Sequence, residues 1–140
     1  MKPRVYINLP VKNLSRSRAF FEALGFGFDD ECSDDTALGM KINDTCHAML
    51  LTREKFAAFT PKNIADAITT TEVLTALQVD DRGEVDALCE VAVDAGASEV
   101  REPQDHGFMY SRGFQDPDGH IWELFWMDPA QVPVTAEAGA

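Results

Sequence analysis

One order of predicted elements occurs twice along this chain, and that repeat constrains the fold more than any other feature. Residues 5–11 are rich in β-branched and apolar side chains and predict a strand. Asn13 or Ser15 can cap a helix over residues 15–24, and Gly25 supplies the left-handed position that ends helices. Three short strands then complete a βαβββ module, around residues 27–30, 36–42 and 47–52.

The second half of the chain returns to the same pattern. Residues 72–79 predict a strand, Asp80-Asp81 can cap a helix, and Gly96 follows the end of that helix. Aligning Val11 with Val79 relates the two halves by a shift of 68 residues. Three more strands are predicted near residues 99–101, 108–115 and 121–126. The two halves therefore read as a duplicated module.

The sequence predicts an α+β fold of two βαβββ modules related by pseudo-twofold symmetry. The modules cover residues 1 to about 60 and about 72 to 128, within one domain over residues 1–128. Residues 53–71, with a short helical stretch, form the linker between them. Residues 129–140 show no periodic pattern, so we expect a flexible tail.

Composition limits the classes of function. With 140 residues and 45% hydrophobic content, the chain can bury a core as one domain. A formal charge of −12 disfavours nucleic acid, which needs clustered Lys and Arg. We recognise neither a membrane span nor a signal peptide, so we expect a cytoplasmic protein without a membrane partner. Three widely spaced cysteines predict neither a disulfide framework nor a zinc knuckle.

Several segments carry a resemblance to a known family. Residues 9–17 before Phe20-Phe21, and the closing segment Phe114 to Leu124, resemble the vicinal oxygen chelate superfamily of glyoxalases, bleomycin-resistance proteins and extradiol dioxygenases. Residues 49–56 and 101–110 are typical of its bacterial branch labelled predicted lactoylglutathione lyases. The resemblance implies sheets curled into a cup that holds a small molecule, and a homodimer.

The metal positions of that superfamily are poorly filled in this chain. The resemblance maps them to Tyr6, Leu50, Leu74 and Glu123, of which only Glu123 is a good ligand. A shift of one residue would replace Leu50 by Met49, an equally poor ligand for a hard cation. We therefore do not expect a divalent metal at the inherited position.

Strand alternation selects the candidate ligand-binding residues. Glu123 lies between Trp122 and Leu124, which we expect to pack under a helix, so Glu123 faces the cup. The same parity argument predicts a pocket lined by Tyr6, Asn8, Gln78, Tyr110, Arg112 and Glu123. Arg112 and Glu123 supply opposite charges that suit a ligand with an anionic group and a hydroxyl or amine. They can equally neutralise each other as a buried pair.

The three histidines have different expected positions and roles. His106 is the best candidate for general acid or base work beside Glu123, because imidazole titrates near neutrality. A structural role in its loop is the competing interpretation. His120 follows a turn glycine and is expected to be exposed. His47 has the opposite parity to Leu50 and is expected to face away from the cup.

These observations leave three functional hypotheses. The resemblance implies a lactoylglutathione-lyase-type isomerisation of a small molecule. The missing metal ligands favour the alternative, a metal-free protein of the bleomycin-resistance type that binds or sequesters a small molecule. The third hypothesis is a metal bound by a rearranged set, such as His106 with Glu123. No phosphate loop or nucleophile elbow is present to support other chemistry.

Overall fold

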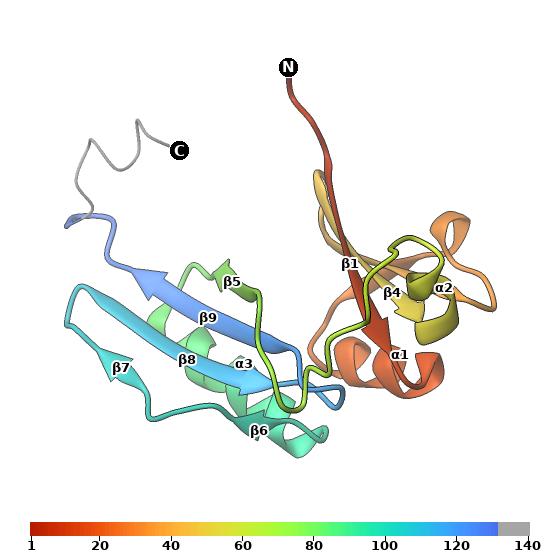
Figure 1. Cartoon of the computed structure of the whole chain (residues 1–140). Helices are drawn as coiled ribbons and strands as arrows, with labels where there is room; N and C mark the ends of the chain where they lie inside the picture. Colours follow the sequence, from red (N-terminus) through yellow and green to blue (C-terminus); the bar gives the residue numbers. More distant parts are fainter. Residues whose placement is uncertain (132–140) are drawn as a thin grey trace. The chain divides into compact units, whose positions relative to one another are not determined.

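The computed structural model describes residues 1–131, in which the chain divides into two compact units (Figure 1). The first unit is Met1–Thr70, and the second begins at Thr71. Each unit holds one mixed sheet with a helix on one face, so the predicted α+β class is confirmed. The predicted flexible tail, residues 129–140, lies outside the described residues from position 132 onward.

The first unit is a βαβββ module whose four strands lie in the order β1-β4-β3-β2. β1 runs parallel to β4, and the other neighbours are antiparallel. A 3-10 turn, η1 (Asp30–Cys32), which the sequence did not predict, follows β2, and α2 (Arg53–Ala57) follows β4. The remaining elements are β1 (Val5–Val11), α1 (Leu14–Ala23), β2 (Gly27–Asp29), β3 (Ala37–Asn43) and β4 (Cys46–Thr52).

The second unit repeats this topology, with strand order β5-β9-β8-β6 and a short extra strand on β8. β5 is parallel to β9, as β1 is to β4, so the predicted duplication is confirmed. The extra strand β7, absent from the prediction, has only two residues. The elements are β5 (Leu74–Gln78), α3 (Arg82–Asp94), β6 (Ser98–Glu99), β7 (Gln104–Asp105), β8 (Met109–Gln115) and β9 (Ile121–Met127).

Local chemistry sets both helix boundaries as predicted. The Asn13 side chain accepts a hydrogen bond from the Arg16 amide at 3.0 Å, and Asp81 accepts one from Gly83 at the start of α3. After each helix the chain turns through a glycine with positive φ, 97° at Gly25 and 120° at Gly96.

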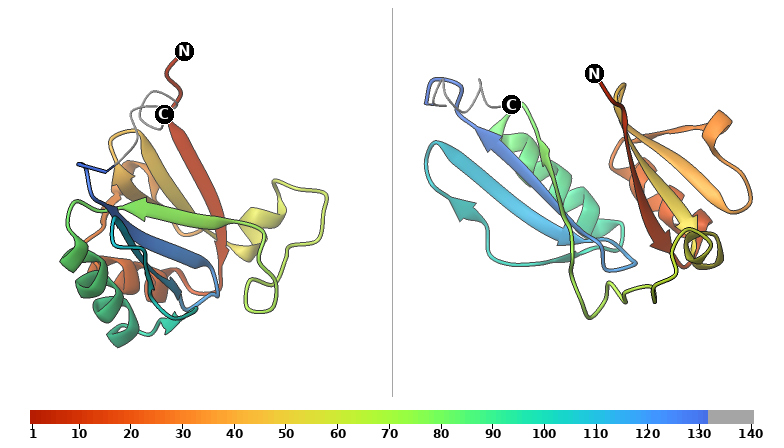
Figure 2. Two further views of the ribbon diagram at one scale, coloured as in Figure 1. Left: turned by 90° about the vertical axis from the view of Figure 1, so that its left-hand side faces the viewer. Right: turned by 45° about the horizontal axis from the view of Figure 1, so that its top comes forward.

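Each sheet has one face covered by its helix. α1 buries Phe20 and Phe21 over the face that carries Met40 and Leu50. Figure 2 shows α3 running along one face of the second sheet, where it packs on β8 and β9. We call the side of each sheet opposite α1 or α3 its helix-free face; in the first unit the short helix α2 also contacts β1 and β4. No helix within residues 1–131 has the length and apolar character that a membrane span needs.

Candidate functional site

The strand register of the second sheet places Glu123 on the helix-free face. Its neighbours along β9, Trp122 and Leu124, are buried and face α3, so Glu123 points the other way. Residues paired across neighbouring strands share a face, and Glu123 pairs with Ala76 of β5 and Gly113 of β8. Gln78, two residues beyond Ala76, lies on that same face.

Glu123 is engaged by an arginine that the sequence analysis did not single out. Arg101, between β6 and β7, places its Nη1 atom 3.1 Å from Oε1 of Glu123. Both side chains are partly buried, with 31% of Arg101 and 21% of Glu123 exposed. A charge-assisted hydrogen bond of this kind holds both groups in place and neutralises the carboxylate.

Gly113 leaves room for this ion pair. A Cβ atom added at Gly113 would lie 3.2 Å from Nη1 of Arg101 and 3.8 Å from Cγ of Glu123. Any side chain at this position would therefore press on the guanidinium. A glycine in the middle of a strand commonly marks such a close approach.

Tyr110 and Arg112 lie on the other face, which corrects the predicted pocket. Tyr110 pairs with Trp126 and Arg112 with Leu124, so both point toward α3 rather than the helix-free face. Arg112 is only 8% exposed. Arg112 and Glu123 therefore lie on opposite faces of the sheet and neither line one pocket nor form the buried pair that the sequence left open as an alternative.

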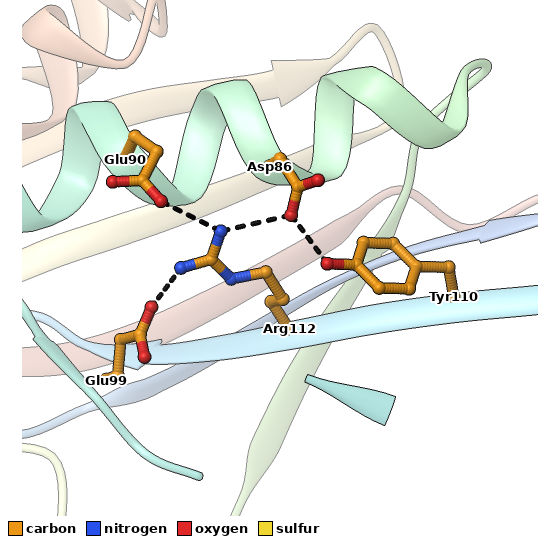
Figure 3. Close-up of polar contacts among 5 residues, drawn as sticks. All are labelled: Asp86, Glu90, Glu99, Tyr110 and Arg112. Carbon is orange, nitrogen blue, oxygen red and sulfur yellow. Dashed lines mark hydrogen bonds and ion pairs between the residues drawn. The ribbon is translucent and has the colours of Figure 1, made fainter. Parts of the chain in front are cut away.

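Arg112 is instead the centre of a cluster of three carboxylates beneath α3 (Figure 3). Its Nη1 atom lies 3.0 Å from both Asp86 and Glu90, one helical turn apart on α3, and its Nη2 atom bonds Glu99. The Tyr110 hydroxyl donates to Asp86 at 2.6 Å.

Contacts within this cluster favour the charged forms of Asp86 and Arg112. The hydrogen bond from Tyr110, and then the contact with Arg112, hold the pKa of Asp86 below its ordinary value. Burial opposes the charge of Arg112, but the hydrogen bonds to the carboxylates outweigh burial and raise its pKa. Arg82 makes two further contacts: its guanidinium lies 4.2 Å from the Tyr110 ring centroid and forms an ion pair with Asp105. The cluster joins α3 to the sheet.

In the first unit, Tyr6 and Asn8 both lie on the helix-free face. Their partners on β4 are His47 and Met49. The Tyr6 and His47 rings stack with centroids 5.1 Å apart and an interplanar angle of 17°. His47 is buried, and its Nδ1 atom has no hydrogen-bond partner among the described residues. His47 thus shares the face of Tyr6, and the expectation that it points away from that face was wrong.

Leu50 was misplaced for the same reason. It pairs with Leu9, has no exposed surface, and belongs to the core under α1. Met49 pairs with Asn8 as Glu123 pairs with Ala76, and the 68-residue shift relates Asn8 to Ala76. Met49, and not Leu50, is therefore the counterpart of Glu123 in the first unit.

His106 does not meet Glu123 in this structure. It is exposed in the loop between β7 and β8, where its backbone amide donates to Met109 at 2.8 Å. Met109 lies four residues along β8 from Gly113, or about 13 Å at roughly 3.3 Å per residue. His120, predicted to be exposed, is half-buried, and its amide donates to Asp116 at 3.0 Å.

A polar hollow of about 470 Å³ lies at the start of α1 but does not make a convincing site. Of its two acidic residues, Asp34 already accepts hydrogen bonds from the amide and hydroxyl of Thr36, and Asn13 caps α1. The side chains of Asp34 and Asn13 are therefore already hydrogen-bonded to the backbone near them. The lining residues are Asn13, Leu14, Ser15, Arg18, Asp34, Asp35, Leu38 and Thr52.

Comparison with known families settles the family of the chain. Residues 4–124 match the sequence model described as the Glyoxalase/Bleomycin resistance protein/Dioxygenase superfamily. The chain belongs to this superfamily. A comparison with curated proteins gave no match.

Several solved structures have the same fold. A hypothetical protein, SA1046, from S. aureus is 26% identical, with a TM-score of 0.77 over 90% of this chain and 94% of its own. A family enzyme from Burkholderia phytofirmans PsJN is 19% identical, with a TM-score of 0.73 over 87% of this chain and 96% of its own. The fosfomycin resistance protein FosX from Listeria monocytogenes is 21% identical, with a TM-score of 0.62 over 86% and 89%. At such identities, the last two show the fold alone.

The residues at the superfamily's metal positions do not fit a divalent cation. With Met49 in place of Leu50, the positions that the resemblance assigns to the metal are Tyr6 and Met49 in the first unit and Leu74 and Glu123 in the second. Leucine cannot donate, a thioether is a soft ligand, and the Glu123 carboxylate already bonds Arg101. Within residues 1–131, no three His, Cys, Asp or Glu side chains come together as a metal would require.

Sequence reasoning missed Arg101 and misjudged His47. The signal for Arg101 was Gly113, an isolated glycine inside a predicted strand, which suggests that another group approaches closely. The signal for His47 was its shared parity with Met49, which becomes informative once Leu50 is assigned to the core.

Proposed function

We propose that this superfamily member binds a small molecule on the helix-free face of its second sheet, without the superfamily's divalent metal. The observation that carries this proposal is the Arg101–Glu123 ion pair, which stands where the one remaining metal ligand would otherwise be free. A positive guanidinium beside the carboxylate supplies the charge that a metal would supply.

The neighbours of the pair suit a binding role. Ala76 and Gly113, the two residues that flank Glu123 on the same face, are the smallest residue types. Gln78 adds an amide with both donor and acceptor atoms on that face. Small-molecule sites typically combine a few such polar groups with apolar surroundings, which here include Leu74 and Phe125.

The lyase-type isomerisation is the weaker alternative. It needs an electrophile for the substrate oxygens and a free base, whereas Glu123 is neutralised by Arg101 and His106 lies far along the sheet. Neighbours named fosfomycin resistance proteins support the view that the fold serves antibiotic-directed roles elsewhere. We therefore favour ligand binding over turnover.

A ligand screen on chelator-treated full-length protein tests the proposal. We expect at least one class of small organic molecule to raise the midpoint of thermal unfolding of the wild-type protein. The affinity for that molecule should be lower in Gln78→Leu and should differ from the wild-type affinity in Glu123→Gln. Gln131→Leu, an exposed position outside both sheets, is the matched control and should leave binding unchanged.

Two results would contradict the proposal. One is hits that require added Zn²⁺ or Ni²⁺, and the other is hits that bind both site variants with wild-type affinity. Conversion of a bound hit to a new product by metal-free protein would instead favour the isomerase.

A further inference from the structure

We propose that Arg101 is the ligand-recognition residue of this site, and that the ligand is a small carboxylate with a hydroxyl or ammonium group next to its carboxylate. This inference rests on the proposed function, because it specifies which side chain and which ligand chemistry that function uses.

The first support is the number of hydrogen-bond donors that Arg101 leaves unused. A guanidinium carries five N–H donors in a planar fork. Among the described residues, the one polar contact of Arg101 is the bond from Nη1 to Glu123, and 31% of its side chain is exposed. The remaining edge of the fork matches the geometry of a second carboxylate.

The second support is the contrast with Arg112. Arg112 is 9% exposed in its side chain and is surrounded by Asp86, Glu90 and Glu99, so its charge is used within the fold. Arg101 meets a single carboxylate and joins no helix to the sheet. Both terminal nitrogens of Arg112 are bonded to carboxylates, and its buried Nε has no partner in the described residues, whereas Arg101 bonds the protein through Nη1 alone and keeps its other donors partly exposed.

The third support is Glu123, which defines the second group on the ligand. One oxygen, Oε1, accepts from Arg101, and the carboxylate has a second oxygen that can accept from a hydroxyl or ammonium. The pair therefore presents donors and an acceptor side by side. A carboxylate with a neighbouring hydroxyl or ammonium presents the complementary order.

Gly113 provides the space in which the Arg101 guanidinium lies. Because a Cβ at Gly113 would lie 3.2 Å from Nη1, the glycine keeps the guanidinium against Glu123 rather than displaced from it. The site thus depends on a residue that itself offers no side chain.

Glycolate and acetate, which differ by one hydroxyl, are the probes that test the inference. Each is titrated into chelator-treated, ¹⁵N-labelled full-length protein, and backbone amide shifts are followed. We expect saturable shifts at Ala76, Arg101, Gly113 and Glu123, with glycolate binding more tightly than acetate.

Two site variants and one control variant should change the affinities for the two probes in different ways. Arg101→Gln should weaken both probes at least about tenfold, since a charge-assisted hydrogen bond is lost. Glu123→Leu should abolish the preference for glycolate and tighten acetate, because Arg101 is then free of its partner. Arg53→Gln, an exposed arginine on α2, makes the same charge change and should leave both affinities unchanged.

The outcomes separate this inference from the proposed function. Equal affinity in wild-type and Arg101→Gln protein, or equal shifts with chloride, would overturn the role of Arg101 while leaving the site intact. Absence of any shift on this face, with screen hits mapping elsewhere, would overturn the proposed function itself.

Discussion

Arg101 and Arg112 show how neighbours decide what a charged residue does. Both lie in the second unit, yet one faces three carboxylates beneath a helix and the other faces one carboxylate on the helix-free side. Desolvating a guanidinium is costly, so the more deeply buried Arg112 needs several carboxylates around its charge. The partly exposed arginine retains donors for a ligand.

Arg112→Ala should lower the free energy of unfolding by about 2–3 kcal/mol, as expected for the loss of hydrogen bonds to charged groups. The loss is limited because the partner carboxylates are 44–66% exposed and regain water. Urea denaturation measures the effect. Arg53→Ala is the control and should change stability by less than about 0.5 kcal/mol. Equal effects of the two changes would show that the cluster does not stabilise the fold.

At the scale of elements, sequence periodicity predicted most helices and strands, whereas strand register escaped it. The caps at Asn13 and Asp81 and the glycines after the helices are local signals, so the βαβββ order could be read directly. A one-residue change of register moves every side chain to the opposite face, and no local signal fixes it.

The faces of β4 and β8 were misassigned for this reason. β8 joins β9 through Asp116, which accepts hydrogen bonds from Asp118, His120 and Trp122, and this turn sets Arg112 opposite Leu124. Burial raises the pKa of Asp116, so the carboxylate is held by hydrogen bonds at a cost. β1, by contrast, fits the prediction because its alternation is regular.

The contact between β3 and η1 predicts a sharp size limit at Gly39. A Cβ there would lie 2.7 Å from Cβ of Cys32, so Gly39→Ala should lower stability by about 1–3 kcal/mol through overpacking. Thermal unfolding measures this. Gly27→Ala, with nothing within 4 Å of the added atom, should have a clearly smaller effect. Similar losses for both changes would refute the packing argument.

The junction of α3 with β8 predicts a dependence of stability on pH. The pKa of Asp86 lies below its ordinary value of 3.8 in the folded state, so its stabilising effect is present above pH 4 and is lost as the pH falls further. Asp86→Asn should therefore destabilise the protein at pH 7 and make less difference near pH 3. Asp94→Asn, exposed in the last turn of α3, serves as control. A difference in stability between the wild-type protein and Asp86→Asn that stays constant from pH 7 to 3 would contradict this explanation.

At the scale of the whole molecule, we propose that the chain forms a homodimer, as its superfamily resemblance implies. Each unit has exposed apolar side chains among its described residues, such as Phe59 and Ile68 in the first and Val73 in the second, and a dimer contact would cover side chains of this kind. Light scattering coupled to size-exclusion chromatography should give twice the chain mass of 15.5 kDa at micromolar concentration. A monomer throughout this range would contradict the proposal.

For the whole molecule, we propose that this superfamily member functions without the divalent metal of its superfamily. Calorimetric titration of the chelator-treated protein with Zn²⁺, Ni²⁺ and Mn²⁺ tests this proposal most directly. The resemblance assigns the metal to Tyr6, Met49, Leu74 and Glu123, of which the first three do not suit a hard cation and the last already bonds Arg101, so we predict weak binding or none. Submicromolar, one-to-one binding that is lost in Glu123→Ala would contradict the account.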